Sequence, residues 1–181
     1  NTGTLLPVYE DTFPLTARTL HEAGKPWVLD PVGIGIGSLR TKLLEQLKPF
    51  KPSIIRGNAS EIMALAGLWG LDSSAGLNRA RGVDSTDTVE AARAAAAALA
   101  RWTGGAVAVS GQRDLITDGT LAAYSYGGSH FMEKVTGCGC SLGGVAAVYA
   151  SAARPFIAAL TAAGAFIRIP LGYSSITLQF L

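Results

Sequence analysis

The sequence predicts a single α/β domain in which helices flank a mainly parallel sheet. Three compact apolar stretches, "PWVLDPVG", "PSIIRG" and "AVAVSG", are typical of buried strands and alternate with stretches of helical character. The chain has 181 residues, of which 49% are hydrophobic, enough for one sizeable core but too short for two comfortable domains. We therefore expect residues 1–181 to form one domain.

The first half of the chain contains two strand, loop and helix units. "PWVLDPVG" at 26–33 predicts a buried strand that leads into an acid and a glycine-rich loop. Ser38 then caps a predicted helix over 38–48, whose leucines fall on one face. "PSIIRG" at 52–57 repeats the strand pattern, and "NASEIMALAGLWG" at 58–70 repeats the helix. This alternation is typical of βαβ units.

The second half begins with a polar, Gly-, Ser- and Asp-rich stretch that predicts a surface loop over 70–87. An Ala-rich helix follows, with Gly104 as its stop signal, and "AVAVSG" at 106–111 predicts the third strand. Asp118-Gly119 separates two alternating runs, which is a strong hairpin signal. Small residues from Val135 then open a last predicted helix, which runs to about Ala153.

Charge and hydropathy limit the classes of partner. Charged residues make up 15% of the chain and the net charge is +2, without the basic block that a nucleic-acid backbone requires. The apolar run at 156–171 is interrupted by Thr161, Gly164, Arg168 and Pro170, so it does not predict a membrane span. We therefore expect neither a nucleic-acid partner nor a membrane.

The cysteines and the two ends indicate the compartment and the extent of the chain. Cys138 and Cys140 are one residue apart, which excludes a disulfide framework, and the start does not resemble a signal sequence. A reducing, cytoplasmic setting fits, with an organelle left open. The chain opens on "NTGTL" without an initiator Met and closes on the β-leaning tail "SSITLQFL". We expect a fragment of a longer protein or an altered gene sequence.

Polar residues stand at the ends of the predicted strands. In a parallel α/β sheet, ligands bind at the carboxyl ends of the strands. The residues that should gather along this rim are Asp30, Arg56, Asn58, Ser110 and the turn at Gly137. A carboxylate at the end of a buried strand is costly without a partner, and a metal-bound water would be such a partner for Asp30. The alternative is that Asp30 caps the turn before Pro31.

The stretch "TGCGC" at 136–140 leads into an apolar helix and suggests an anion site, because free N–H groups and a helix dipole coincide there. The alternative is a tight turn that needs glycine only for its geometry. The same dipole favours a thiolate at Cys140, which could act as base or nucleophile, or could be a small buried residue at the helix start. A zinc site from Cys138, Cys140, His21 and His130 is disfavoured by the cysteine spacing.

Two further motifs have alternative interpretations. "NASE" at 58–61 has the spacing of a capping box, and Glu61 at the strand-to-helix rim could also orient water on Mg²⁺. Arg56 offers a charge for phosphate. "GIGIG" from Gly33 invites a dinucleotide-binding interpretation, but Ser38 replaces the third glycine and no acid follows about twenty residues later.

Together, "VLDPVGIG", "PSIIRGNASEI", "VAVSGQRDLITDG" and "VTGCGCSLGG", in this order, resemble the hydroxyethylthiazole kinase family of the ribokinase-like superfamily. The opening "NTGTL" is similar to a segment of that family as well, and the resemblance covers about residues 1–153, with 154–181 unlike the family. It implies a three-layer ribokinase-like fold and transfer of the ATP γ-phosphoryl group to 4-methyl-5-(2-hydroxyethyl)thiazole in thiamine salvage.

The resemblance also implies roles for individual residues. Gly137, Cys138 and Gly139 would form the anion hole of the T-G-x-G-C turn, with Gly137 also next to the substrate, and Cys140 would be the catalytic base. Arg56, Ser110 and Thr136 would contact ATP, and Asp30 and Glu61 would act around Mg²⁺. These roles are physically coherent because phosphoryl transfer depends mainly on positioning and charge neutralisation.

The resemblance leaves some features open. Members of the family carry a further N-terminal segment and assemble as homotrimers with sites between subunits, so we expect a homotrimer if the fold is complete. The alternatives are a kinase of another small alcohol in the same superfamily, or an inactive remnant that binds nucleotide.

Overall fold

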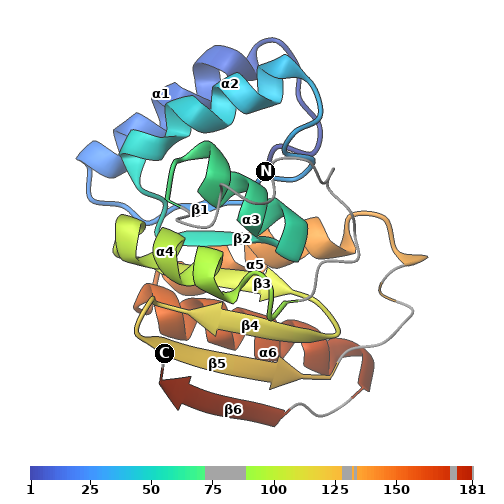
Figure 1. Ribbon diagram of the computed structural model, residues 1–181. Helices are drawn as coiled ribbons and strands as arrows, with labels where there is room; N and C mark the ends of the chain where they lie inside the picture. The colour runs from blue at the N-terminus through green and yellow to red at the C-terminus, as the bar shows by residue number, and fades with distance from the viewer. Residues whose placement is uncertain (72–88, 128–131, 133, 172–174, 181) are drawn as a thin grey trace.

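A computed structural model describes residues 1–71, 89–127, 132, 134–171 and 175–180. Figure 1 shows helices packed on both faces of one six-stranded sheet of order β1-β2-β3-β4-β5-β6. The strands are β1 (Val28–Leu29), β2 (Ile54–Asn58), β3 (Ala106–Ser110), β4 (Arg113–Thr117), β5 (Leu121–Tyr126) and β6 (Ser175–Phe180). The helices are α1 (Tyr9–Glu22), α2 (Ser38–Leu47), the short 3-10 helix η1 (Lys48–Phe50), α3 (Ala59–Leu68), α4 (Arg93–Thr103), α5 (Cys138–Ala150) and α6 (Pro155–Leu171).

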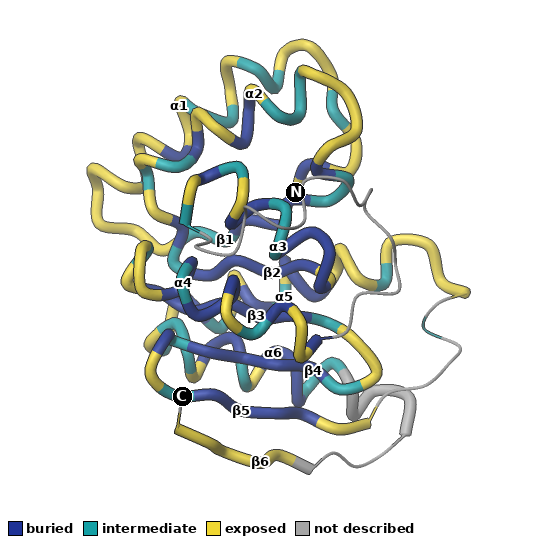
Figure 2. The backbone as a smooth tube through the Cα atoms, viewed as in Figure 1, coloured by how far each residue is buried: buried dark blue, intermediate teal, exposed yellow. Residues whose placement is uncertain are grey.

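Alternate residues of the central strands enter two separate cores, which makes the fold three-layered. Ile55 and Val107 join the core under α3 and α4, whereas the neighbouring Ile54 and Ala108 join the core under α5 and α6. The central strands are therefore buried on both faces, as Figure 2 shows by their dark colour. This burial explains why their sequences are apolar runs rather than alternating patterns.

The sheet is mixed, which corrects the expectation of a mainly parallel sheet while leaving the α/β class intact. β1, β2 and β3 are parallel neighbours, in line with the two βαβ units. The three remaining pairings, from β3 through β6, are antiparallel. The hairpin between β4 and β5 turns at Asp118, whose carboxylate accepts from the Thr120 and Leu121 amides. The predicted hairpin is thus confirmed.

Most predicted elements form within a few residues of their expected bounds. The strand predicted over 26–33 is shorter, with only Val28–Leu29 paired. Ser38 does not cap α2: it is the first helical residue, and the cap is Gly37, whose φ of 78° suits glycine. Gly104 ends α4 in the left-handed conformation, as expected. The predicted loop at 70–87 lies outside the described residues from Asp72 onward.

The sequence predicted neither α1 nor α6, and it indicated β6 only as a β-leaning tail. α1 contains Pro14 and three threonines, each of which turns its hydroxyl back to the carbonyl four residues earlier, so it lacks a strong helical signal. The apolar run at 156–171 forms α6, which packs on α5 and on the strands from β2 to β5. Among the described residues, no helix is both long and apolar enough to span a membrane.

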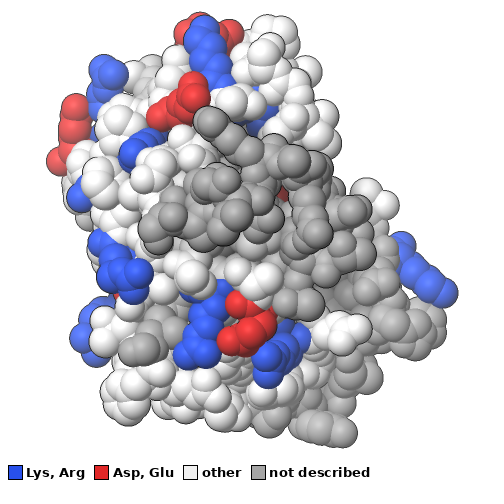
Figure 3. All heavy atoms as spheres, viewed as in Figure 1, with Lys and Arg blue, Asp and Glu red and all other residues white. Residues whose placement is uncertain are grey.

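Charges of both signs are interspersed over the face drawn in Figure 3. Where the surface is described, Glu90 forms ion pairs with both Arg93 and Arg113, and it also accepts from the Tyr124 hydroxyl. The opposite charges of these exposed pairs cancel locally, and the pairs contribute little to stability.

One close backbone contact gives a direct test of the packing. A Cβ at Gly105 would lie 2.2 Å from the Ser53 carbonyl oxygen, where β3 begins beside β2, whereas a Cβ at Gly67 on α3 would meet open space. We expect Gly105→Ala to lower the free energy of unfolding by about 2 kcal/mol or more through backbone displacement. Gly67→Ala should raise it by about 0.5–1 kcal/mol, because alanine favours the helix. Urea denaturation of both variants measures this, and equal effects would contradict the packing described.

Candidate active site

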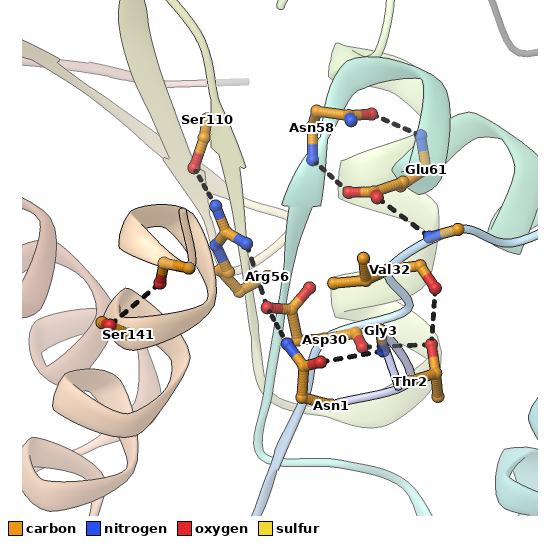
Figure 4. A network of polar contacts seen from close by, with 12 residues as sticks. Asn1, Thr2, Gly3, Asp30, Val32, Arg56, Asn58, Glu61, Ser110 and Ser141 are labelled. Atoms are coloured by element: carbon orange, nitrogen blue, oxygen red, sulfur yellow. Dashed lines mark hydrogen bonds and ion pairs between the residues drawn. The ribbon is translucent and has the colours of Figure 1, made fainter. Parts of the chain in front are cut away.

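The side chain of Arg56 is the centre of a polar network at the carboxyl ends of β1, β2 and β3 (Figure 4). It extends from β2 toward the face covered by α5 and α6, because it shares that face with Ile54. Its Nη1 donates to Asp30 Oδ2 over 3.0 Å, and its Nη2 donates to Ser110 Oγ over 3.3 Å. One guanidinium therefore connects the ends of all three parallel strands.

Burial makes the ion pair between Arg56 and Asp30 the main electrostatic feature of the site. Arg56 is 8% exposed and Asp30 is 2% exposed. Burial raises the pKa of Asp30, and the charge and hydrogen bond of Arg56 oppose that rise. The sequence predicted that Asp30 needs a partner but not that Arg56 would be that partner. The alternative role, capping the turn before Pro31, is wrong because the carboxylate turns toward Arg56 and Asn1.

Two atoms of this pair keep unused hydrogen-bonding capacity. Asp30 Oδ1 and Arg56 Nε are buried and have no hydrogen-bond partner among the residues that the structure describes. Native proteins satisfy nearly all such groups. An open acceptor on Asp30 and an open donor on Arg56 fit a ligand that brings a cation or its water together with an anionic oxygen.

The N-terminus of α5 lies directly on Arg56. A Cβ at Gly139 would be 3.0 Å from Arg56 Nη2, and a Cβ at Gly143, one turn on, would be 3.7 Å from Asp30 Oδ2. Small residues at these two positions let the helix approach the ion pair. The helix begins after Gly137, whose φ of 80° suits glycine, and within the described residues no side-chain cap is formed at this N-cap. The Cys138 amide donates to the Val135 carbonyl, so the amides that follow it and the helix dipole are the groups that could meet an anion beside Arg56.

The two cysteines lie in the first turn of α5. Both are free thiols; Cys138 is half-buried and Cys140 is exposed. The exposure of Cys140 overturns the alternative that it is a small buried residue at the helix start. Thr136 lies in the exposed turn that precedes the helix. No group of three metal-binding side chains of the His, Cys, Asp and Glu types occurs in the described part of the chain, and His130, one candidate zinc ligand, lies outside that part.

Glu61 forms the predicted capping box at the start of α3 (Figure 4). Asn58 Oδ1 accepts from the Glu61 amide over 2.8 Å, and Glu61 Oε2 accepts from the Asn58 amide over 2.9 Å. The other carboxylate oxygen, Oε1, accepts from the Gly33 amide over 3.2 Å. Glu61 therefore ties the glycine loop after β1 to the end of β2.

The first residues of the chain also reach this site, which the sequence did not predict. Asn1 Nδ2 donates to Asp30 Oδ2 over 2.8 Å, and its Oδ1 accepts from the Gly3 amide. Thr2 is fully buried and bonds to the backbone of Asp30 and Val32. The motif "NTGTL" resembles a segment of the family, but its contact with a loop about thirty residues away carries no local sequence signal.

Asp114 is a second buried carboxyl near Arg56 that the sequence did not single out. It is 9% exposed, and its Oδ1 accepts from the Gly111 amide over 3.1 Å. Burial raises its pKa to about 6, and the bond from Gly111 and the charge of Arg56 limit that rise. The sequence "SGQRD" gave no signal for this burial, because an Asp just after a hairpin turn is usually exposed.

Known proteins match this chain both in sequence and in fold. A model of the hydroxyethylthiazole kinase family matches residues 1–169, past the residue 153 at which the motif resemblance was expected to end. Hydroxyethylthiazole kinase of Bifidobacterium adolescentis is 51% identical over 90% of this chain and 58% of its own length. The enzyme of that name from Leptospira interrogans is 41% identical over 100% of this chain and 68% of its own length. The chain thus spans about three fifths of the first of these relatives.

Solved structures agree on the fold. A hydroxyethylthiazole kinase protein from Pyrococcus horikoshii superposes with a TM-score of 0.79 at 24% identity, covering 99% of this chain and 75% of that chain. A pyridoxal kinase from Staphylococcus aureus, solved with AMP-PCP and pyridoxal, superposes with a TM-score of 0.65 at 17% identity. The match covers 95% of this chain and 69% of that chain. These similarities confirm the expected ribokinase-like fold.

The raised pKa of Asp114 predicts a pH dependence of stability. Its carboxyl releases its proton near pH 6 when folded and near pH 4 when unfolded, so the folded state holds more protons between these values. The contribution of Asp114 is therefore most favourable below pH 4 and declines by up to about 3 kcal/mol as the pH rises through 6. Asp114→Asn, measured by urea denaturation from pH 4 to 7, should lack this decline. Parallel curves for the variant and the unmodified chain would contradict the assignment.

Proposed function

Since the chain belongs to the hydroxyethylthiazole kinase family, we propose that it transfers the γ-phosphoryl group of ATP to the hydroxyl of 4-methyl-5-(2-hydroxyethyl)thiazole, a step of thiamine salvage. The observation that carries this proposal is the buried Arg56 guanidinium, held by Asp30 and Ser110 directly beside the uncapped N-terminus of α5. A fixed cation and a row of helix amides together suit the terminal phosphates of a nucleotide.

Arg56, Ser110 and Thr136 are the proposed ATP-binding side chains, and the first turn of α5 is the proposed anion hole. Ser110 and Arg56 already contact one another, so phosphate oxygens would meet a prearranged pair. Gly137 and Gly139 carry no side chains and leave the helix amides accessible at close range. Cys138 contributes its backbone in this arrangement, and Gly137 also borders the alcohol. Prearranged donors stabilise developing charge without reorganisation during the reaction.

Asp30 and Glu61 are the proposed residues of a Mg²⁺ site. Asp30 fits, because its Oδ1 is buried and lacks a hydrogen-bond partner. Glu61 already accepts a backbone N–H at each oxygen, so it would act through its remaining lone pairs or through a water. When bound, Mg²⁺ supplies charge neutralisation on the phosphate oxygens. The capping box keeps Glu61 in place, so capping and metal binding are compatible.

Cys140 is the proposed base. Its exposed thiol lies in the first turn of α5, beside the proposed anion hole. The thiolate takes the hydroxyl proton while the alcohol oxygen forms a bond to the γ-phosphorus. The bond between that phosphorus and the bridging oxygen breaks, and ADP leaves with the electron pair. The proton thus goes to Cys140, the phosphoryl group to the alcohol and the electron pair to ADP.

The assembly and the compartment are further proposals that rest on the same family membership. We propose a homotrimer, because apolar side chains such as Val148 on α5 and Ile157 on α6 are exposed and available for a contact between subunits. A cytoplasmic location is proposed with it, since ATP and a reducing environment suit an enzyme that depends on a free thiol.

The proposed reaction is tested by incubating the purified chain with MgATP and the thiazole alcohol, and following the phosphorylated product by mass spectrometry. We expect product from the unmodified chain, a loss of about a hundredfold in kcat for Cys140→Ala, and retained activity for Cys140→Asp, which restores a base. An inert Cys140→Asp variant that still binds ATP would contradict the role of Cys140. A folded chain that binds ATP without forming product would instead support a nucleotide-binding remnant, and product from only another alcohol would support a sibling kinase.

The close contact of α5 with Arg56 gives a second test. The methyl group of Gly139→Ala would press on Arg56 Nη2, whereas Gly144→Ala, on the same helix, would place its methyl group in open space. We expect Gly139→Ala to raise the KM for ATP about tenfold, because the guanidinium must shift away from the phosphates. Gly144→Ala should leave that KM unchanged. Steady-state kinetics of the two variants measures this, and equal KM values would argue against phosphate binding at this helix end.

A further inference from the structure

We propose that Asp114 is a positioning residue of the phosphate site, which holds the turn after Ser110 through the Gly111 amide and so keeps the Ser110 hydroxyl against Arg56. This inference rests on the proposed function, because it assigns a supporting residue to the same phosphate site.

The register of the β3–β4 hairpin places Asp114 where it can act on Ser110. Val109 pairs with Leu115, so Ser110 and Asp114 are the next residues at the mouth of the turn formed by Gly111 and Gln112. Asp114 shares its face of the sheet with Ile116, which is the face toward which Arg56 also points. Its Oδ1 accepts from the Gly111 amide over 3.1 Å, one residue beyond Ser110.

The turn is held from its other side as well. A Cβ at Gly111 would lie 2.4 Å from Val89 Cγ2, so the backbone of this turn is packed closely against Val89. The carboxylate of Asp114 on one side and Val89 on the other leave the turn little room to move. Because Ser110 is the residue that enters the turn, its hydroxyl is fixed within 3.3 Å of Arg56 Nη2.

Charge supports the same arrangement. Asp30 and Asp114 are both buried, and the charge of Arg56 acts on both carboxyls. Hydrogen bonds join Asp30 to Arg56 and Arg56 to Ser110, and the backbone leads from Ser110 to the Gly111 amide, which donates to Asp114. Burying a carboxyl is costly, and the hydrogen bond from the Gly111 amide offsets part of that cost.

A double-mutant cycle tests whether Asp114 acts through Ser110. Asp114→Val removes the acceptor but suits a buried strand, Asp114→Asn keeps an acceptor, and Ser110→Ala removes the hydroxyl. The control is Ser125→Ala, which changes the fully buried hydroxyl paired with Asp114 on β5. The dissociation constant of ATP is measured for each variant by calorimetry, together with KM and kcat.

We expect Asp114→Val to weaken ATP binding about two- to tenfold, to raise the KM for ATP more than it lowers kcat, and to add nothing in the Ser110→Ala background. Asp114→Asn and Ser125→Ala should bind ATP as the unmodified chain does. The proposal is overturned if Asp114→Val binds ATP normally, if Asp114→Asn is equally impaired, or if the loss persists in full without the Ser110 hydroxyl.

Nuclear magnetic resonance distinguishes a failure of this inference from a failure of the proposed function. Absence of ATP binding to the unmodified chain would contradict the proposed function alone. Even without ATP binding, the chemical shift of the Arg56 Nε–H should differ from that of the unmodified chain in Asp114→Val, as it should in Ser110→Ala. An unchanged chemical shift in Asp114→Val would overturn the inference. In the unmodified chain the Gly111 amide should exchange slowly with solvent. Exchange at the rate of an exposed loop amide would overturn the inference even if no Asp114 variant folds.

Discussion

The buried ion pair between Arg56 and Asp30 is the interaction on which the arrangement of the rim depends. Neither charge has much access to water, so each stabilises the other, and removing one partner of such a pair typically costs about 3–5 kcal/mol. The pair also joins β1 to β2, and the second arm of Arg56 joins β2 to β3 through Ser110. A single side chain thereby sets the relative positions of three strand ends. Groups so held can meet a charged substrate without reorganisation.

The surrounding elements are adapted to this pair. α5 is closest to it at Gly139, where a Cβ would lie 3.0 Å from Arg56 Nη2, whereas a Cβ at Gly143 would be in ordinary contact with Asp30 Oδ2 at 3.7 Å. Glu61 Oε1 accepts from the Gly33 amide in the glycine loop after β1, and Asn1 Nδ2 donates to Asp30 Oδ2, the same oxygen that Arg56 contacts. The helix end, the loop and the first residues of the chain therefore converge on one carboxylate and one guanidinium.

Local sequence patterns predicted the elements whose signals are local. The capping box at Asn58 and the Asp118-Gly119 hairpin are formed by residues within a few positions of one another, and both were confirmed. α1 was missed because Pro14 and its threonines weaken the helical pattern, although packing against α2 stabilises it. The antiparallel half of the sheet was underestimated because β6 pairs with β5 from about fifty residues away.

The residues of the candidate site likewise fall into those that local patterns predicted and those that they did not. The rim residues were predicted because strand ends are recognisable, and their convergence follows from the topology of parallel strands. That Asp30 bonds to Arg56 rather than capping its own turn depends on side chains that are 26 residues apart. Asn1 and Asp114 were missed for the same reason, since their partners lie outside any local pattern or depend on burial that the fold creates.

The most direct test of the central claim is a crystal structure of this chain with Mg²⁺ and a non-hydrolysable ATP analogue. We predict that the terminal phosphates lie between the Arg56 guanidinium and the first amides of α5, with the cation next to Asp30. Phosphates bound elsewhere on the chain, with the Arg56 and Asp30 pair left out of contact, would contradict the account.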